Sequence, residues 1–183
     1  MTTRIQKTER PHLTDVCDKY ADIPNLVMMC VGSVAWSPPK PVMEAMSNDL
    51  QLMTHLNGYG DLLGEERLRT HLKHHLQRSG INTESLDVTV TAGANQAFIN
   101  ITMALCDPGD KAVLVAPFFC SHKLGLQLCG AEVSVCPFDP STFAPNFTVL
   151  ESMLVTLKPK MVSLILYSLG LKGIKFNEKP NTT

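Results

Sequence analysis

VTVTAGANQAFINITMALCDPGDKAVLVAPFF, residues 88–119, is the stretch of sequence that decides the fold. It begins with alternating valine and threonine, β-branched residues that predict an extended strand at 88–92. Small residues follow in a predicted turn at 93–95. The next apolar residues recur at helical spacing, which predicts a helix over 96–105. A strand, a turn of small residues and a helix in this order are typical of an α/β fold.

The turn formed by Gly93, Ala94 and Asn95 is a candidate anion site. The first turn of a helix has unpaired N–H donors and a partial positive charge from the helix dipole. Gly93 can adopt backbone angles that other residues avoid, and it lets a ligand approach the backbone closely. The alternative is structural, with a glycine that only relieves crowding between strand and helix. The stretch contains neither GxGxxG nor GxxxxGK[ST], so the dinucleotide and P-loop fingerprints are missing.

The second half of the stretch predicts an aromatic residue close to this turn. Residues 107–110 form a predicted tight turn, and residues 112–116 a buried strand that ends at Phe118 and Phe119. A phosphate-binding turn beside a flat ring would suit a planar phosphorylated ligand, whereas the alternative buries both rings in the core. Successive residues at a strand end face opposite ways, so we expect Phe118 in the core and Phe119 beside the turn.

TAGANQAF, DPGD and APFF, in this order and spacing, resemble segments of the class I/II aminotransferases, pyridoxal-phosphate enzymes of fold type I. A further match is to the family's Y-x4-G-x3-LR signature, which this chain carries as Tyr59, Gly64, Leu68 and Arg69. The resemblance runs from about Asn25 to Val162 and thus covers the N-terminal part of the family. It implies an α/β fold, an incomplete aminotransferase-like large domain with three layers, a mostly parallel sheet and an N-terminal arm.

The resemblance also implies a division into three segments and a cofactor. Residues 1–45 would be the arm and a small-domain segment, 46–166 a partial pyridoxal-phosphate-binding large domain, and 167–183 a divergent tail. Ala94 and Asn95 would hold the phosphate of pyridoxal phosphate, with Gly93 shaping their turn. Phe119 would stack on the pyridine ring. Tyr59 would reach the phosphate of the neighbouring subunit's cofactor, because family homodimers share their active sites.

Two residues near the N-terminus are implied on the substrate side. A family glycine at the position of Gly32 lies over the substrate carboxylate, and Trp36 is a candidate to face the substrate. The family's G-x-P-[DE] form is replaced here by Gly-Ser-Val-Ala at 32–35. The alternative for Trp36, which follows a predicted strand at 26–31, is a structural anchor in the core.

The second half of the family's catalytic set is not found in this sequence. The NPxNPTG segment should follow a predicted strand at 161–167, but the chain reads YSLGLKG at 167–173. The ring-nitrogen aspartate, the Schiff-base lysine and the substrate-carboxylate arginine lie further on in the family. Lys172 and Lys175 fall where the asparagine motif belongs and are expected to be surface lysines. We therefore assign no catalytic residue and expect a truncated polypeptide that is inactive alone.

Composition excludes some classes of function. A net charge of −1 argues against a nucleic-acid surface, and no apolar stretch is long enough to span a membrane. The six cysteines include no CxxC pair and the N-terminus is too polar for a secretory signal, which favours reduced thiols in the cytoplasm. Histidines 71, 74 and 75 share a predicted helix with basic residues, a pattern that favours a solvated face over a metal site.

Two classes of function remain open at this point. The first is an aminotransferase-family polypeptide whose complete form would act on amino acids and 2-oxo acids. The second is a non-catalytic module that binds a phosphate ligand or pairs with full-length subunits through the region of Tyr59. In the rest of the chain, apolar spacing predicts one helix that begins at about residue 41 and a second that ends at about residue 79. It also predicts helices at 121–128 and 149–157 and a strand at 132–136.

Overall fold

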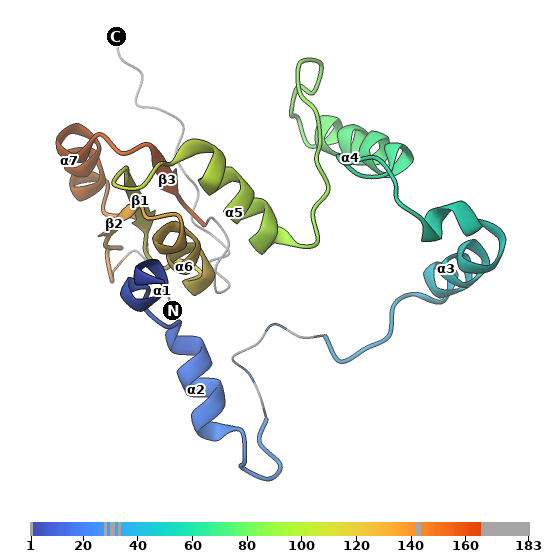
Figure 1. Cartoon of the computed structure of the whole chain (residues 1–183), viewed down its shortest axis with the longest axis horizontal. Coiled ribbons are helices and arrows are strands. Elements are labelled where there is room, and N and C mark those ends of the chain that lie inside the picture. The colour runs from blue at the N-terminus through green and yellow to red at the C-terminus, as the bar shows by residue number, and fades with distance from the viewer. Residues whose placement is uncertain (1, 28, 30–31, 33, 142–143, 166–183) are drawn as a thin grey trace. The chain divides into compact units, whose positions relative to one another are not determined.

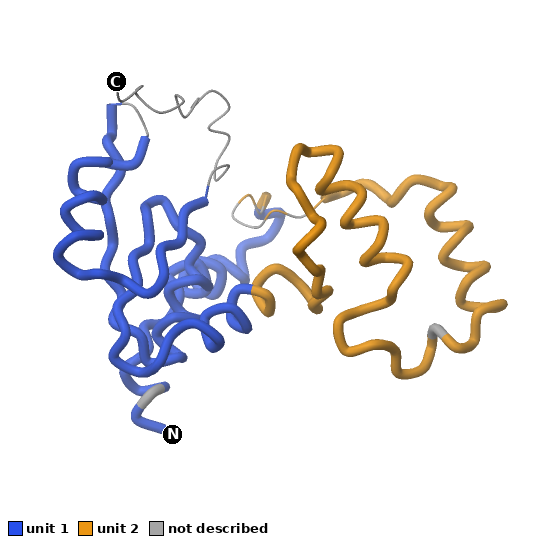
Figure 2. The backbone as a smooth tube through the Cα atoms, turned by 90° about the horizontal axis from the view of Figure 1, so that it is seen from above, with its two compact units in different colours: residues 1–26, 98–183 blue, residues 27–97 orange. Residues whose placement is uncertain are grey.

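The computed structural model describes residues 2–165 except 28, 30–31, 33 and 142–143. These residues form two compact units, drawn in separate colours in Figure 2. Unit 1 consists of Met1–Leu26 and the residues from Phe98 onward, and unit 2 of Val27–Ala97. The three segments expected from the sequence, with boundaries at 45 and 166, stay a prediction.

A parallel three-stranded sheet forms the centre of unit 1 (Figure 1). The strand order is β2–β1–β3, where β1 is Lys111–Val115, β2 is Glu132–Cys136 and β3 is Met161–Ser163. Both neighbours run parallel to β1. Helix α6 (Cys120–Leu128) connects β1 to β2, and helix α7 (Phe147–Leu157) precedes β3, as parallel pairing requires.

Two apolar clusters cover the two faces of β1. Ala112 and Leu114 face one cluster, in which they pack with residues of α6 and of helix α5 (Ala94–Leu105). Val113 and Val115 face the other cluster, which is completed by Cys136 and α7. Because side chains alternate along a strand, a strand that is apolar throughout is buried on both faces. Helices therefore lie on either side of the sheet, which confirms the expected three-layer α/β architecture.

A glycine brings α5 and α6 close together. A Cβ atom built on Gly125 of α6 would lie 3.3 Å from a side-chain carbon of Ile99 on α5. On the same helix α5, the buried Thr102 donates its hydroxyl to the carbonyl of Phe98 at 2.8 Å. This helix pair therefore buries a polar side chain without leaving its hydroxyl unsatisfied.

The N-terminal segment of unit 1 forms two short helices. They are α1 (Thr3–Lys7) and α2 (His12–Tyr20), and the side chain of Thr2 caps the first of them. Helix α1 packs against α6, although the two are far apart in the sequence. The sequence predicts an N-terminal arm or one short helix here, and the structure contains two short helices.

Unit 2 contains helices α3 (Lys40–Leu52) and α4 (Glu66–Arg78) with a 3-10 turn at Thr54–Asn57. Proline near the start of α3 suits a position where the backbone N–H has no partner within the helix. At the start of α4, the carboxylate of Glu65 accepts a hydrogen bond from the N–H of Leu68 at 2.8 Å. Both helices are thus started by local sequence signals, and their expected positions are confirmed.

The strand expected at 88–92 is wrong. In the structure these residues are not in a strand. The segment is instead held to α4 by Arg69, whose Nε donates to the carbonyl of Val88 at 2.8 Å and whose Nη2 lies 2.7 Å from both carboxylate oxygens of Asp87. β-branched residues favour an extended chain, but a strand also needs a neighbour to pair with.

Gly64 allows the loop before α4 to approach this segment. Its φ is +107°, and a Cβ built on it would lie 2.7 Å from the Cβ of Val90. The N–H of Val90 donates to the carbonyl of Leu63 at 2.8 Å. Glycine is therefore required at position 64 by both backbone conformation and space.

The other expected elements agree with the structure in most places. The helices expected at 121–128 and 149–157 correspond to α6 and α7, and the strands expected at 112–116 and 132–136 to β1 and β2. Of the strand expected at 161–167, residues 161–163 form β3, 164 and 165 are not in a strand, and 166 and 167 lie outside the described residues. The strand expected at 26–31 also lies partly outside them. No helix in the described part of the chain is long and apolar enough to cross a membrane.

Candidate functional site

The turn before α5 opens into unfilled space. Gly93 has a φ of +152°, and a Cβ atom built on it would meet no other atom within 4 Å. Helix α5 begins at Ala94, two residues earlier than expected, so Ala94 and Asn95 lie in its first turn. All three residues are exposed. The expected open turn is confirmed, although the expected strand before it is not.

Side-chain hydrogen bonds shape this turn while leaving its main-chain donors available. The N–H of Ala92 donates to Oε1 of Gln96 at 2.8 Å, and the hydroxyl of Thr91 donates to the carbonyl of Gly93 at 2.9 Å. The first N–H of the helix that finds a carbonyl is that of Ala97, which pairs with Gly93. The N–H groups of residues 94–96 have no carbonyl partner inside the helix and are free to bind an anion.

Gln96 is a residue of this turn that the sequence did not bring to notice, and its side chain accepts the hydrogen bond from Ala92. It is the third residue of the helix, the place where glutamine or glutamate commonly reaches back to the preceding backbone. That position was the signal that could have identified it. The first turn of α5 also contains no acidic residue. A bound phosphate would therefore meet backbone donors and the positive end of the helix dipole without a nearby carboxylate to repel it.

The two phenylalanines after β1 differ in burial as expected. Phe118 packs against the cluster around Leu114, whereas 47% of Phe119 is exposed. Phe119 is the residue immediately before the first turn of α6. The structure thus leaves the ring of Phe119 accessible to a ligand. Its position beside Gly93 stays a prediction, since the two residues belong to different units.

His122 lies in the first turn of α6 and contacts Phe119, and no pattern in the sequence indicated it. The two rings are perpendicular at 88°, with centroids 5.8 Å apart. The same imidazole stacks on Phe98 of α5 with centroids 3.9 Å apart and planes 6° from parallel. Its Nδ1 lies 3.5 Å from the hydroxyl oxygen of Ser163 in β3. Burial lowers the pKa of His122 below its ordinary value, so the ring is neutral at pH 7.

The remaining residues implied by the resemblance lie in unit 2 or outside the described chain. Tyr59 is fully exposed and Trp36 is 75% exposed, so the alternative that Trp36 anchors a core is wrong. Gly32 is exposed, and a Cβ built on it would meet nothing within 4 Å. The roles of these three residues stay predictions. Lys172 and Lys175 lie outside the described residues.

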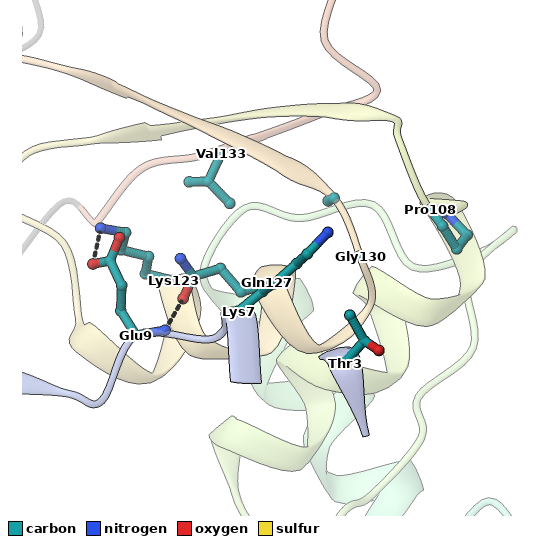
Figure 3. A pocket seen from close by; sticks show the side chains of 9 residues that line it. Thr3, Lys7, Glu9, Pro108, Lys123, Gln127, Gly130 and Val133 are labelled. Carbon is teal, nitrogen blue, oxygen red and sulfur yellow. Dashed lines mark hydrogen bonds and ion pairs between the residues drawn. The ribbon is translucent and has the colours of Figure 1, made fainter. Parts of the chain in front are cut away.

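A separate hollow of about 460 Å³ lies in unit 1 where the N-terminal segment meets α6 (Figure 3). Glu9 ties the segment down in two ways. Its carboxylate accepts a hydrogen bond from Nζ of Lys123 at 2.6 Å, and its N–H donates to Oε1 of Gln127 at 3.2 Å. The hydrogen bond from Lys123 lowers the pKa of Glu9. None of the site residues expected from the sequence lines this hollow.

Replacing Glu9 by glutamine is expected to loosen residues 3–9 without affecting the sheet. The change removes the ion pair with Lys123 but keeps the backbone bond to Gln127. Because the folded pKa of Glu9 is lowered, its ion pair contributes fully above the ordinary value of 4.5 and is lost as the pH falls through the folded value. In the wild type, the hydrogen-exchange protection factors of this segment should therefore decrease as the pH is lowered through the folded pKa of Glu9.

In the Glu9→Gln variant, residues 3–9 should have lower hydrogen-exchange protection factors than the wild type at pH 7. These factors should not decrease further when the pH is lowered. Glu44→Gln is the matched control, since Glu44 pairs with Lys40 on the exposed surface of unit 2 at 3.6 Å. That control should leave the N-terminal segment unchanged. Equal protection of the segment in the wild type and in Glu9→Gln would contradict the prediction.

Unit 1 is an α/β unit with a parallel sheet between helices and an accessible ring after its central strand, and unit 2 ends at an open glycine turn. The chain belongs to the aminotransferase class I and II family, whose sequence model matches residues 24–168. Members of this family depend on pyridoxal phosphate. The expected family, fold class and cofactor are thereby confirmed.

Similar proteins include several aminotransferases of known sequence. The chain is 31% identical over 168 residues to the aromatic aminotransferase ISS1 of Arabidopsis thaliana, covering 90% of this chain and 42% of the relative. It is 29% identical over 147 residues to the valine–pyruvate aminotransferase of Mycobacterium tuberculosis, covering 79% of this chain and 36% of the relative. The chain thus spans less than half the length of these relatives.

Solved structures of the same family share the fold. The aspartate aminotransferase of Rhizobium meliloti matches with a TM-score of 0.75 and 23% identity, over 88% of this chain and 41% of that one. The aspartate aminotransferase of Thermotoga maritima matches with a TM-score of 0.69 and 26% identity, over 84% of this chain and 42% of that one. This chain therefore shares its fold with part of these aminotransferases.

Proposed function

We propose that this chain supplies the phosphate-binding and ring-stacking part of a pyridoxal-phosphate-dependent aminotransferase. The reaction would transfer an amino group between an amino acid and a 2-oxo acid, the class of reaction that the names of its relatives share. The observation that carries the proposal is the open turn at Gly93, where α5 presents its first N–H groups to unfilled space. In a family that depends on pyridoxal phosphate, this turn is suited to the phosphate of the cofactor.

The chain's own groups would bind and orient the cofactor. The N–H groups of Ala94 and Asn95 would hold the phosphate, and Gly93 would let it approach the backbone without a Cβ in the way. Phe119 would stack on the pyridine ring and exclude water from that side. Bound pyridoxal phosphate would supply a ring that withdraws electrons from the substrate, and the protein's share is to place that ring.

We also infer that the protein works as a homodimer, with Tyr59 reaching the phosphate of the partner's cofactor. Two observations support this. Tyr59 is fully exposed, and α3 carries a set of exposed apolar side chains, Val42, Met43, Met46 and Leu50. A second subunit would cover such a surface. The same observations support the second candidate function, a non-catalytic module that pairs with full-length subunits through this region.

On the substrate side we propose that Gly32 and Trp36 border the amino-acid site. The support is that both are exposed and therefore accessible to a small molecule. We further propose a cytoplasmic location. Cys106, Cys120 and Cys136 are free thiols, the state expected in a reducing compartment.

Asn95→Asp is expected to weaken pyridoxal phosphate binding by roughly tenfold or more. A carboxylate in the first turn of α5 would repel the phosphate, and a unit charge a few ångströms away costs more than about 1 kcal/mol even at the dielectric of a protein surface. Binding to the purified 183-residue chain can be followed by the absorbance and fluorescence of the cofactor. Pyridoxal without phosphate should bind more weakly than pyridoxal phosphate.

Asn100→Asp provides a matched control. It makes the same change on an exposed position of α5 beyond the first turn, and it should alter the affinity less than Asn95→Asp does. If both variants bind pyridoxal phosphate as the wild type does, or if pyridoxal binds equally well, the phosphate is not held at this turn and the proposal fails.

A further inference from the structure

The ring of Phe119 is accessible, and its freedom to rotate would oppose ligand binding unless a neighbouring residue restrains it. Phe119 is 47% exposed and lies at the start of α6, so much of its surface is accessible. A free aromatic side chain that must become fixed when a ligand stacks on it lowers the affinity through lost rotamer freedom. Contacts that hold the ring before the ligand arrives reduce this entropic cost.

We propose that His122 is a positioning residue that fixes the plane of the Phe119 ring for stacking on a flat aromatic ligand. The inference rests on the proposed function, in which that ligand is the pyridine ring of pyridoxal phosphate. His122 itself would not touch the cofactor. It would act through Phe119, with which it makes the perpendicular ring contact at 5.8 Å.

A perpendicular contact can restrain a ring without covering both of its faces. Aromatic pairs prefer edge-to-face or offset geometries because the ring edge carries partial positive charge and the face partial negative charge. In such a pair one ring is restrained by contact with the other. A restrained Phe119 would keep an accessible surface for the ligand.

His122 can restrain Phe119 only if it is itself fixed, and two other elements hold it. Phe98 of α5 stacks on the imidazole at 3.9 Å with nearly parallel planes. Ser163 of β3 lies on another side, with its hydroxyl oxygen 3.5 Å from Nδ1. Since burial keeps the imidazole neutral at pH 7, it packs as an aromatic ring and not as a cation. Side chains from α5 and β3 therefore fix the imidazole ring of His122 on α6, and this ring in turn contacts Phe119.

The experiment compares His122→Ala with His122→Phe in the full 183-residue chain. Two ligands separate the ring from the phosphate: pyridoxal phosphate, followed by its fluorescence, and inorganic phosphate, followed by phosphorus NMR. His122→Ala should lower the affinity for pyridoxal phosphate about two- to tenfold, the range expected for one aromatic pair. It should leave the affinity for inorganic phosphate within about twofold of the wild type.

His122→Phe keeps a flat ring between Phe98 and Phe119 and should restore most of the affinity for pyridoxal phosphate. His74→Ala is the control for loss of a histidine, since His74 is exposed on α4, and it should change neither affinity. Circular dichroism shows whether each variant is folded, and His122→Phe keeps the test decisive if His122→Ala is not.

The outcomes distinguish this inference from the proposed function. If the wild-type chain does not prefer pyridoxal phosphate over pyridoxal, the proposed function fails and the inference fails with it. If the wild type binds and His122→Ala binds equally well, only the inference is overturned. A His122→Ala variant that loses both ligands to the same extent and is not rescued by phenylalanine would show a general structural role, which also overturns it.

Discussion

Gly64→Ala is expected to destabilise unit 2 by roughly 2–4 kcal/mol, a large fraction of the stability of a small domain. Two effects add at this position. A residue with a Cβ is strained at a φ of +107°, and the new atom would lie 2.7 Å from the Cβ of Val90. The neighbour cannot rotate away, because a Cβ is fixed to the backbone and the N–H of Val90 is bonded to Leu63. The loop before α4 would have to separate from residues 87–90.

Gly80→Ala separates the two effects. Gly80 also has a positive φ, +85°, but a Cβ there would meet nothing within 4 Å. This variant should cost only the backbone strain, about 1–2 kcal/mol. Thermal unfolding followed by circular dichroism gives the stabilities, and hydrogen exchange locates the loss in unit 2. If the two variants lose the same stability, the contact with Val90 does not matter and the prediction is wrong.

Leu114→Ala is expected to have a comparable effect on unit 1, a loss of about 2–5 kcal/mol. Leu114 is fully buried at the centre of β1 and packs in the cluster that joins the sheet to α5 and α6. Alanine would remove three carbons from a position where the strand and the two helices leave little room to relax. The cavity that remains adds to the lost burial, which is why the cost exceeds that of exposing a leucine.

Leu105→Ala is the control for this change. Leu105 is exposed at the end of α5, so its loss should alter stability by about 0.5 kcal/mol or less. Urea unfolding measures both variants, and an unchanged denaturant slope would show that the folded and unfolded states keep their exposed areas. If Leu114→Ala and Leu105→Ala unfold at the same urea concentration, the prediction that Leu114 contributes more to stability than Leu105 is wrong.

Elements with strong local signals were predictable from the sequence. Strand β1 is an apolar run bounded by a tight turn and a proline, and helix α6 and strand β2 follow it in the alternation typical of an α/β fold. The contrast between Phe118 and Phe119 was also predictable, because neighbouring residues at the end of a strand point to opposite sides. In each case the residues that define the element lie within a few positions of one another.

Residues 88–92 show where local signals fail. Their alternation of valine and threonine predicts a strand, yet pairing depends on a neighbour that no local pattern reveals. The segment is held by Arg69, a residue 19 positions away from Val88, through its side chain. Trp36 is a similar case, since composition favours burial of tryptophan but the residue is 75% exposed.

The local geometry of the candidate site was predictable where it depends on one motif and not where it depends on contacts between elements, and the roles of its residues stay predictions. The turn formed by Gly93, Ala94 and Asn95 could be predicted because three consecutive residues of the sequence define it. His122 could not be found this way, because its contacts are with Phe98 and Ser163, which belong to other elements. Gln96 is intermediate, as its position in the helix carries a capping signal that was available in the sequence.

The attachment of the N-terminal segment has a consequence for synthesis on the ribosome. Glu9 binds Lys123, which follows it by 114 residues, and Gln127, which follows it by 118. At about 5–20 residues per second, the segment waits roughly 6–23 s before its binding surface on α6 has been translated. All of unit 2 is made in the meantime. Helix α1 and Glu9 therefore cannot take up their final contacts until α6 has been made.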